Sequence, residues 1–279
     1  MSTTTSAPTP APKGRAVIEL QVREARRITP HMIRVVAGGD EFSRFVDNGY
    51  SDAYVKILFP RPGVTYPEPL DMQVVRAQMP REDWPVTRTY TVRALDPAAR
   101  EITIDFVYHG DEGLAGPWAA AAQPGDRLLL LGPGGAYAPS ADADWHLFVG
   151  DESALPAIGA SLARVPAGVP ARALIEIDSP EEEQELDSPG DLKITWLHRS
   201  AGAPALPDAL AAAEFLPGRV HAFVHGEADT VKEMRRHLLG ERGVAREDLS
   251  ISGYWRRGRT EDGFQADKAA EREAENKQQ

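Results

Sequence analysis

The sequence predicts a β-barrel domain followed by an α/β domain with a parallel sheet. From Arg15 to about Tyr137, short runs rich in Val, Ile, Leu and Tyr follow one another, punctuated by Gly, Pro and Asp. After about Pro139, strand-like runs alternate with helix-like runs, the pattern of βαβ units. The chain has 279 residues, more than a common single domain, so two domains are expected.

The expected domain boundaries follow these changes in composition. Residues 1–14 are rich in Ser, Thr, Pro and Ala and are predicted to be disordered, residues 15–139 form the barrel domain, and residues 140–259 form the α/β domain. Residues 260–279 form a charged tail. From Glu261 the tail has nine charged residues in nineteen and one strongly apolar side chain, Phe264, so even a helical tail is expected to bury little of itself.

Six strand-like runs make up the predicted barrel. They cover residues 15–29, 31–39, 52–60, 88–95, 101–109 and 126–133. One Ala-rich helical run, residues 114–122, interrupts them. Six short strands with a single helical interruption favour a small closed barrel.

The α/β domain is predicted from five strands and three helices. The strands are expected at residues 145–150, 171–177, 192–198, 219–226 and 248–255, and the helices at 153–165, 206–215 and 228–242. Such a sheet binds ligands beyond the carboxyl ends of its strands. Asp151 and Ser153 are expected to cap the first helix, and Pro156 suits its first turn.

Composition narrows the classes of function. The chain has no cysteine, which excludes disulfides, cysteine-ligated metal centres and a thiol nucleophile. Its seven histidines are scattered, so no protein-bound metal centre is predicted. A net charge of −11 makes a nucleic-acid partner improbable. No run approaches about 18 apolar residues and the start lacks an apolar signal segment, so no membrane insertion and a cytoplasmic location are expected.

The hairpin over residues 85–110 carries more polar and aromatic groups than an ordinary hairpin needs. Arg88 and Tyr90 project to one face of a strand, where an arginine pairs with a diphosphate and a tyrosine stacks on a flat ring. Thr91 adds a hydroxyl near the ring edge. The alternative is a surface arginine and a half-buried tyrosine. The Gly-rich loop after His109 leads into the Ala-rich helix, whose first N–H groups suit a phosphate.

In conjunction, these motifs resemble the siderophore-interacting protein family, flavin-dependent ferric-siderophore reductases of the ferredoxin-reductase superfamily. The resemblance is carried by DAYVKILFP (52–60), RTYTVR (88–93), DFVYHG (105–110), GLAGPWA (113–119), PGDRLLLLGPGGAY (124–137), GDESALPAI (150–158) and GYWRRG (253–258). Leu114, Gly116, Pro117 and Ser153 depart from the family pattern. The resemblance implies a ferredoxin-reductase-like fold, FAD as cofactor, and NADPH or NADH as electron donor to a ferric siderophore substrate.

Cofactor-binding roles follow for residues in both domains: Arg88, Tyr90, Thr91, Asp105, Val107, His109, Gly113, Ala115, Trp118, Asp151, Ser153, Ala154, Arg199, Glu227, Tyr254 and Trp255. Arg199 is expected to meet the 2′-phosphate of NADPH, the alternative being a solvated loop. Lys56, Arg256 and Arg257, with Arg259 as a weaker candidate, are expected to attract an anionic iron chelate. No catalytic side chain is expected, since the flavin supplies the chemistry.

Two other functions remain open. The protein could be a flavin reductase that exchanges electrons with a protein carrier, or a siderophore-binding protein that performs no reduction.

Overall fold

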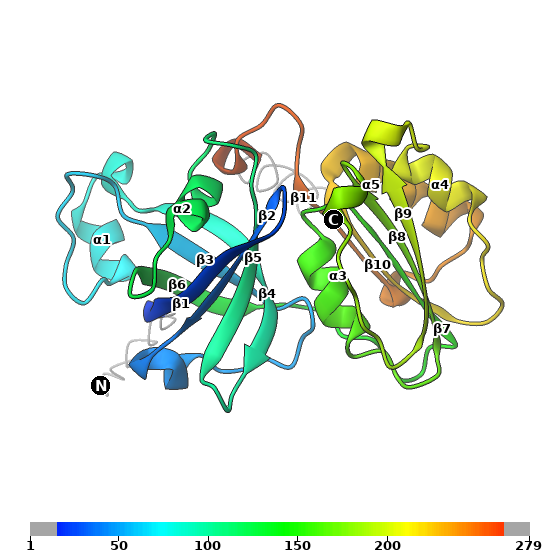
Figure 1. Cartoon of the computed structure of the whole chain (residues 1–279), viewed down its shortest axis with the longest axis horizontal. Helices are drawn as coiled ribbons and strands as arrows, with labels where there is room; N and C mark the ends of the chain where they lie inside the picture. The colour runs from blue at the N-terminus through cyan, green and yellow to red at the C-terminus, as the bar shows by residue number, and fades with distance from the viewer. Residues whose placement is uncertain (1–15, 265–279) are drawn as a thin grey trace, which may run out of the picture.

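A computed structural model describes residues 16–264, and Figure 1 shows its two domains side by side. The first domain is a closed antiparallel barrel with the strand order β1-β2-β5-β4-β3-β6. Its strands are β1 (Ile18–Thr29), β2 (Met32–Gly38), β3 (Tyr54–Phe59), β4 (Val86–Asp96), β5 (Glu101–Val107) and β6 (Arg127–Gly134). The predicted six-stranded barrel is confirmed.

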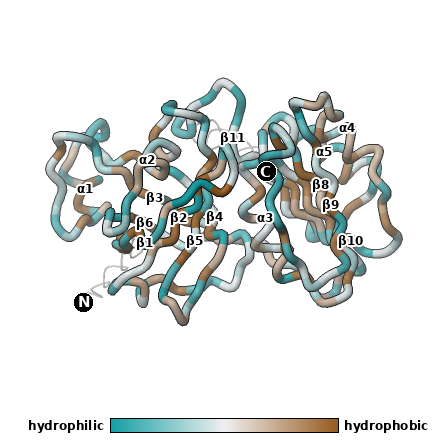
Figure 2. The backbone as a smooth tube through the Cα atoms, viewed as in Figure 1, coloured by the Kyte–Doolittle hydropathy of each residue, from teal (hydrophilic) through white to brown (hydrophobic). Residues whose placement is uncertain are grey.

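The barrel core comes from alternation along the strands. Leu20, Ile57, Ile104 and Leu130 are almost fully buried, and Figure 2 shows the hydrophobic stretches following the strands. Helix α2 (Ala115–Ala121) packs against β1, β2 and β5. Its Trp118 packs a large apolar surface against the barrel core.

The long connection between β3 and β4 contains a helix that the sequence did not suggest. Helix α1 (Met72–Gln78) begins after Asp71, whose carboxylate accepts hydrogen bonds from the N–H groups of Gln73 and Val74. Met72 and Val75 are buried against Leu58 and Leu129. With only two deeply buried side chains in a seven-residue helix, the apolar periodicity is too short to distinguish it from a loop.

The second domain is a five-stranded parallel sheet with the order β11-β10-β7-β8-β9. Its strands are β7 (Trp145–Gly150), β8 (Pro170–Ile177), β9 (Asp191–His198), β10 (Val220–Glu227) and β11 (Leu249–Trp255). The helices are α3 (Leu155–Leu162), α4 (Leu206–Ala212) and α5 (Ala228–Arg236), the last continuing as a π-helical turn to Glu241. These elements confirm the predicted α/β domain.

Both faces of this sheet are covered, which explains its nearly continuous apolar strands. Phe148 and Phe223 face α3, whereas Leu147 and Val224 face α4 and α5. In the part of the chain that the structure describes, no helix is both long enough and apolar enough to cross a membrane.

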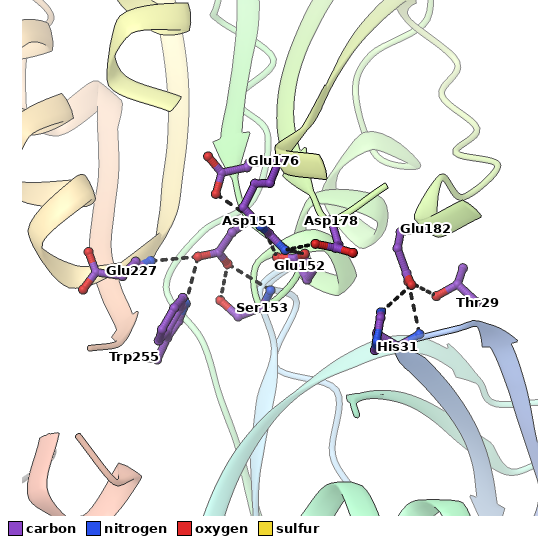
Figure 3. Close-up of polar contacts among 11 residues, drawn as sticks. Thr29, His31, Asp151, Glu152, Ser153, Glu176, Asp178, Glu182, Glu227 and Trp255 are labelled. Carbon is purple, nitrogen blue, oxygen red and sulfur yellow. Dashed lines mark hydrogen bonds and ion pairs between the residues drawn. The ribbon is translucent and has the colours of Figure 1, made fainter. Parts of the chain in front are cut away.

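Contacts at α3 and at Glu182 are among those that join the domains. Helix α3 lies against β4, with Ser51 Oγ 2.8 Å from Ser161 Oγ and the Arg93 side chain packed on Gly159. Further along, the buried Glu182 accepts hydrogen bonds from Thr29 Oγ1 at 2.6 Å and from the His31 N–H at 3.2 Å. Figure 3 shows this second contact beside the loop that carries Glu182. The predicted disordered segment, residues 1–14, lies outside the described residues.

Candidate functional site

Strand β4 holds the first group of predicted residues. Arg88 lies opposite Ile57 and Tyr90 opposite Val55 in the β3–β4 register, so both side chains project to the same side of the strand. The Tyr90 ring packs on Phe106, with 4.3 Å between ring centroids, and burial raises the pKa of the Tyr90 hydroxyl well above its usual value. Thr91 is buried. The strand therefore presents a cation beside an aromatic ring.

The segment after β11 folds back onto this strand. Glu261 accepts a hydrogen bond from the Thr89 N–H at 2.9 Å, and Asp262 Oδ2 lies 3.2 Å from Arg88 Nη1. Phe264 is only 4% exposed, beneath Gly253 and the guanidinium of Arg256. The expectation that the tail buries little is wrong for Phe264, which a short helical turn over residues 261–264 packs against the α/β domain, while Asp262 stays exposed. Residues 265–279 lie outside the described part.

Lys56 lies next to this contact. Lys56 is on β3, which pairs with β4, and its Nζ is 3.3 Å from Thr89 Oγ1 of β4. Arg256, at the other end of the tail turn, lies 3.8 Å from Asp229 and over the Phe264 ring at 5.7 Å. The tail turn thus links the predicted cations Lys56 and Arg88 of the barrel to Arg256 of the α/β domain.

The residues expected on β5 and α2 lie in varied surroundings. Asp105 is buried and its two carboxylate oxygens each accept a 2.7 Å hydrogen bond from Arg34, so this carboxylate joins β2 to β5. Val107 is half-buried and His109 is exposed. Ala115 is buried, while Trp118 makes edge and tilted contacts with Phe59 and Phe106. Gly113 has a φ of +84°, which favours glycine. Cofactor contacts of these residues stay a prediction.

Asp151 organises the carboxyl edge of the parallel sheet, as Figure 3 shows. One carboxylate oxygen accepts from the Ser153 N–H at 2.9 Å and from Ser153 Oγ at 2.5 Å. The other accepts from the Glu227 N–H at 2.9 Å and from Trp255 Nε1 at 2.8 Å. Burial raises the pKa of Asp151, and the hydrogen bonds from Ser153 and Trp255 oppose that rise. One side chain thereby connects the ends of β7, β10 and β11.

This arrangement corrects the expected helix cap. Neither Asp151 nor Ser153 caps α3, because the helix starts later, after Ala154, which makes no side-chain cap. Asp151 is instead occupied by the turn and by the neighbouring strands. Pro156 does lie in the first turn, as expected.

Glycine and glutamate at the end of β10 complete the edge. Gly226 has a φ of +145°, and a Cβ there would lie 2.6 Å from an Asp151 carboxylate oxygen, so only glycine fits. Glu227 caps α5 by accepting from the N–H groups of Asp229 and Thr230, both at 2.9 Å. It also accepts from the Arg257 N–H at 3.3 Å. Both oxygens of Glu227 therefore hold backbone in place.

Two aromatic side chains end β11. The Tyr254 ring lies 4.7 Å from the His225 ring, and burial raises the pKa of its hydroxyl far above the usual value. Trp255 is 39% exposed even though its indole N–H is held by Asp151. A large aromatic surface is thus fixed in orientation but open to a ligand.

Arg199, after β9, lies among acidic side chains that the sequence analysis did not single out. Its guanidinium pairs with both oxygens of Glu152 and lies 3.3 Å from Glu176 Oε1. The hydrogen bonds that Arg199 donates to Glu152 raise the pKa of Arg199 further above its usual value, while burial opposes this rise. The available signal was the placement of acidic residues directly after two neighbouring strands, in GDES and IEID. Among residues 16–264, no group of three or more His, Asp or Glu is arranged to hold a metal ion.

Comparisons with known proteins agree with this architecture. Residues 21–137 match the siderophore-interacting FAD-binding domain, and residues 143–258 match the siderophore-interacting protein family. A ferredoxin reductase component of carbazole 1,9a-dioxygenase shares the fold at 17% identity, with a TM-score of 0.64, covering 86% of this chain and 70% of that one.

Closer relatives span nearly the whole chain. An uncharacterised protein of Mycobacterium tuberculosis is 44% identical, covering 94% of this chain and 98% of its own length. The ferric vibriobactin reductase of Vibrio cholerae is 32% identical, covering 85% and 88%. The solved structure of a siderophore utilization protein from T. fusca is 41% identical, with a TM-score of 0.75, covering 88% and 94%.

Proposed function

Because this chain belongs to the siderophore-interacting protein family, we propose that it is an FAD-dependent reductase that uses NADH or NADPH to reduce ferric siderophores and release Fe(II). One observation carries the proposal. The segment after β11 lies on β4, so the chain that leaves the aromatic end of the parallel sheet reaches the cations of the barrel. A barrel-bound flavin and a sheet-bound dinucleotide would meet there.

The residues present fit an FAD. Arg88 now pairs with the carboxylates of Glu261 and Asp262, at 3.7 Å and 3.2 Å, and a bound diphosphate would take their place. A diphosphate is an anion that suits its planar fork, and Lys56 adds a second positive charge on the adjacent strand. Tyr90 supplies an aromatic neighbour, and Thr91 a hydroxyl. We assign Arg88, Tyr90 and Thr91 to the flavin.

On the other side of the site, the exposed Trp255 face and the Asp151 turn would receive the nicotinamide nucleotide. Asp151 fixes the Trp255 indole, and Gly226 allows the Asp151 carboxylate to approach the strand end closely. Lys56, Arg256 and Arg257 would orient an anionic iron chelate. These side chains bind and orient, and none of them needs to form a covalent bond.

FAD, when bound, accepts two electrons at once and passes them on singly, which matches a hydride donor to a one-electron acceptor. One NAD(P)H therefore reduces two ferric chelates, with release of NAD(P)⁺, one proton and two Fe(II). Hard oxygen donors hold Fe(III) far better than Fe(II), so reduction loosens the complex. The chain's part is to hold the flavin and the nicotinamide nucleotide close to each other, and to keep Trp255 fixed beside the end of β10.

Anaerobic mixing of the purified flavoprotein with NADH or NADPH, a panel of ferric siderophores and a ferrous chelator tests the proposal. We expect flavin bleaching on addition of nucleotide, then recovery of flavin colour as the ferrous complex forms. Bleaching without any iron reduction would favour a reductase that serves a protein carrier. Siderophore binding without bleaching would favour a non-catalytic binding protein. Either outcome would overturn the proposal.

A further inference from the structure

An acidic cluster surrounds Arg199 at the carboxyl edge of three neighbouring parallel strands. Glu152 follows β7, Glu176 lies near the end of β8, Asp178 follows β8, and Arg199 follows β9. The strands are adjacent, with Gly150 opposite Ile175 and Ile177 opposite His198. Carboxyl ends of parallel strands form the ligand edge of such a sheet. Figure 3 shows Glu152, Glu176 and Asp178 side by side near Asp151.

The guanidinium of Arg199 is already ion-paired with the carboxylates of this cluster. Arg199 Nη1 lies 3.0 Å from one oxygen of Glu152 and 3.3 Å from Glu176, Nη2 contacts the other Glu152 oxygen, and Asp178 lies 4.0 Å away. Within residues 16–264, these three carboxylates pair with no other Lys or Arg. One positive charge among three negative charges leaves the cluster with a net charge of −2.

That charge balance bears on the adenosine ribose of a dinucleotide. A 2′-phosphate would bring up to two further negative charges to a cluster that is already anionic, and it would have to displace Glu152 from Arg199. A free 2′-hydroxyl, in contrast, donates a hydrogen bond to a carboxylate. An acidic side chain at the end of the second strand of a dinucleotide-binding unit recognises ribose hydroxyls in this way. Glu176 lies in the last two residues of the second strand, β8, and Asp178 directly follows that strand.

We propose that Glu176 and Asp178 select a dinucleotide with an unphosphorylated ribose, NADH, and that Arg199 positions these carboxylates instead of binding a 2′-phosphate. The inference rests on the proposed function, and it replaces the expectation that Arg199 favours NADPH. Glu176 is 24% and Asp178 50% exposed, so both are reachable by a ligand that lies on the strand ends. Arg199 is a positioning residue, and its role is to keep two like charges close together.

Nucleotide fragments test the inference without reference to turnover. Calorimetric titration of the holoprotein with 5′-ADP and with 2′,5′-ADP measures the effect of the 2′-phosphate alone. We expect 5′-ADP to bind about tenfold tighter or more. The double variant Glu176→Gln with Asp178→Asn should improve 2′,5′-ADP binding by about tenfold, because two like charges are removed. Glu181→Gln with Glu185→Gln is the matched control, since it removes two exposed charges from the same loop outside the cluster, and it should change binding by less than about threefold.

Stopped-flow reduction of the flavin by NADH and by NADPH, with no iron present, gives the second measurement. Wild-type protein that binds 2′,5′-ADP as tightly as 5′-ADP, or an Arg199→Ala variant that loses only NADPH, would overturn the inference and leave the proposed reductase intact. Flavin that neither nucleotide reduces would reject the proposed reductase, while the fragment titrations would still decide the role of Glu176 and Asp178.

Discussion

Replacing Asp151 with Asn should destabilise the α/β domain and disorganise Trp255. The carboxylate accepts four hydrogen bonds, two on each oxygen. The amide of Asn keeps one accepting oxygen, so its NH₂ group must face two N–H donors. If the oxygen stays with Ser153, the N–H groups of Glu227 and Trp255 lose their acceptor.

The magnitude follows from these lost bonds. A hydrogen bond to a charged acceptor contributes about 1.5–3 kcal/mol, so two of them amount to about 3–6 kcal/mol. Asn also removes a buried charge, whose burial cost is seen in the raised pKa of Asp151, and this relief offsets part of the loss. We expect a net decrease of about 2–4 kcal/mol in the free energy of unfolding. Ser153→Ala is the control: it removes one bond to the carboxylate, worth about 1.5–3 kcal/mol, and leaves the N–H groups of Glu227 and Trp255 with their acceptor.

Urea unfolding at pH 7.5, followed by tryptophan fluorescence, measures the stability change. The same samples give the rate of flavin reduction by NADH, which should fall more in the Asp151 variant than in the Ser153 variant, because only the former releases Trp255. An Asp151→Asn protein whose unfolding free energy lies within about 0.5 kcal/mol of wild type would refute the hydrogen-bond argument. Equal reduction rates in both variants would refute the positioning of Trp255.

Three further predictions concern other parts of the chain. Arg88→Ala should weaken FAD binding about tenfold or more, from a lost charge-assisted contact of about 1.5–3 kcal/mol; unchanged affinity in a flavin titration would remove Arg88 from the flavin site. Neutralising Lys56 and Arg256 together should raise KM for an anionic chelate at low salt but not for a neutral one, and equal, salt-independent losses would leave these cations a structural role only. Burial, and then His221, lower the pKa of His146 to about 4. Neutral His146 makes its full contribution to the free energy of unfolding above pH 6.5, the pKa of a histidine in the unfolded chain. That contribution is lost as the pH falls from 6.5 towards 4. Between pH 7.5 and pH 5 the wild type should lose about 2 kcal/mol that His146→Phe does not lose, as urea titrations at both values would show.

The sequence alone determined the order and kind of most elements. Runs in which apolar residues recur at every second position, such as ITIDFV, predict a strand whatever its neighbours in the sheet are. The alternation of strands such as WHLFVG with Ala- and Leu-rich helices predicts a parallel sheet. The motif around Arg88 and Tyr90 and the strand-end turn at Asp151 were visible for the same reason: their spacing is local. The short helix α1 was missed because its periodicity is too brief.

Only the tertiary structure decided which groups meet. The partners of Arg88 lie more than 170 residues away, in a tail whose composition predicted little burial, and Phe264 of that tail is buried against Gly253 and Arg256. Arg199 looked like a free cation, yet three carboxylates converge on it. They come from strand ends that are adjacent only in the sheet order β7-β8-β9, and local sequence fixes a strand without fixing its neighbours.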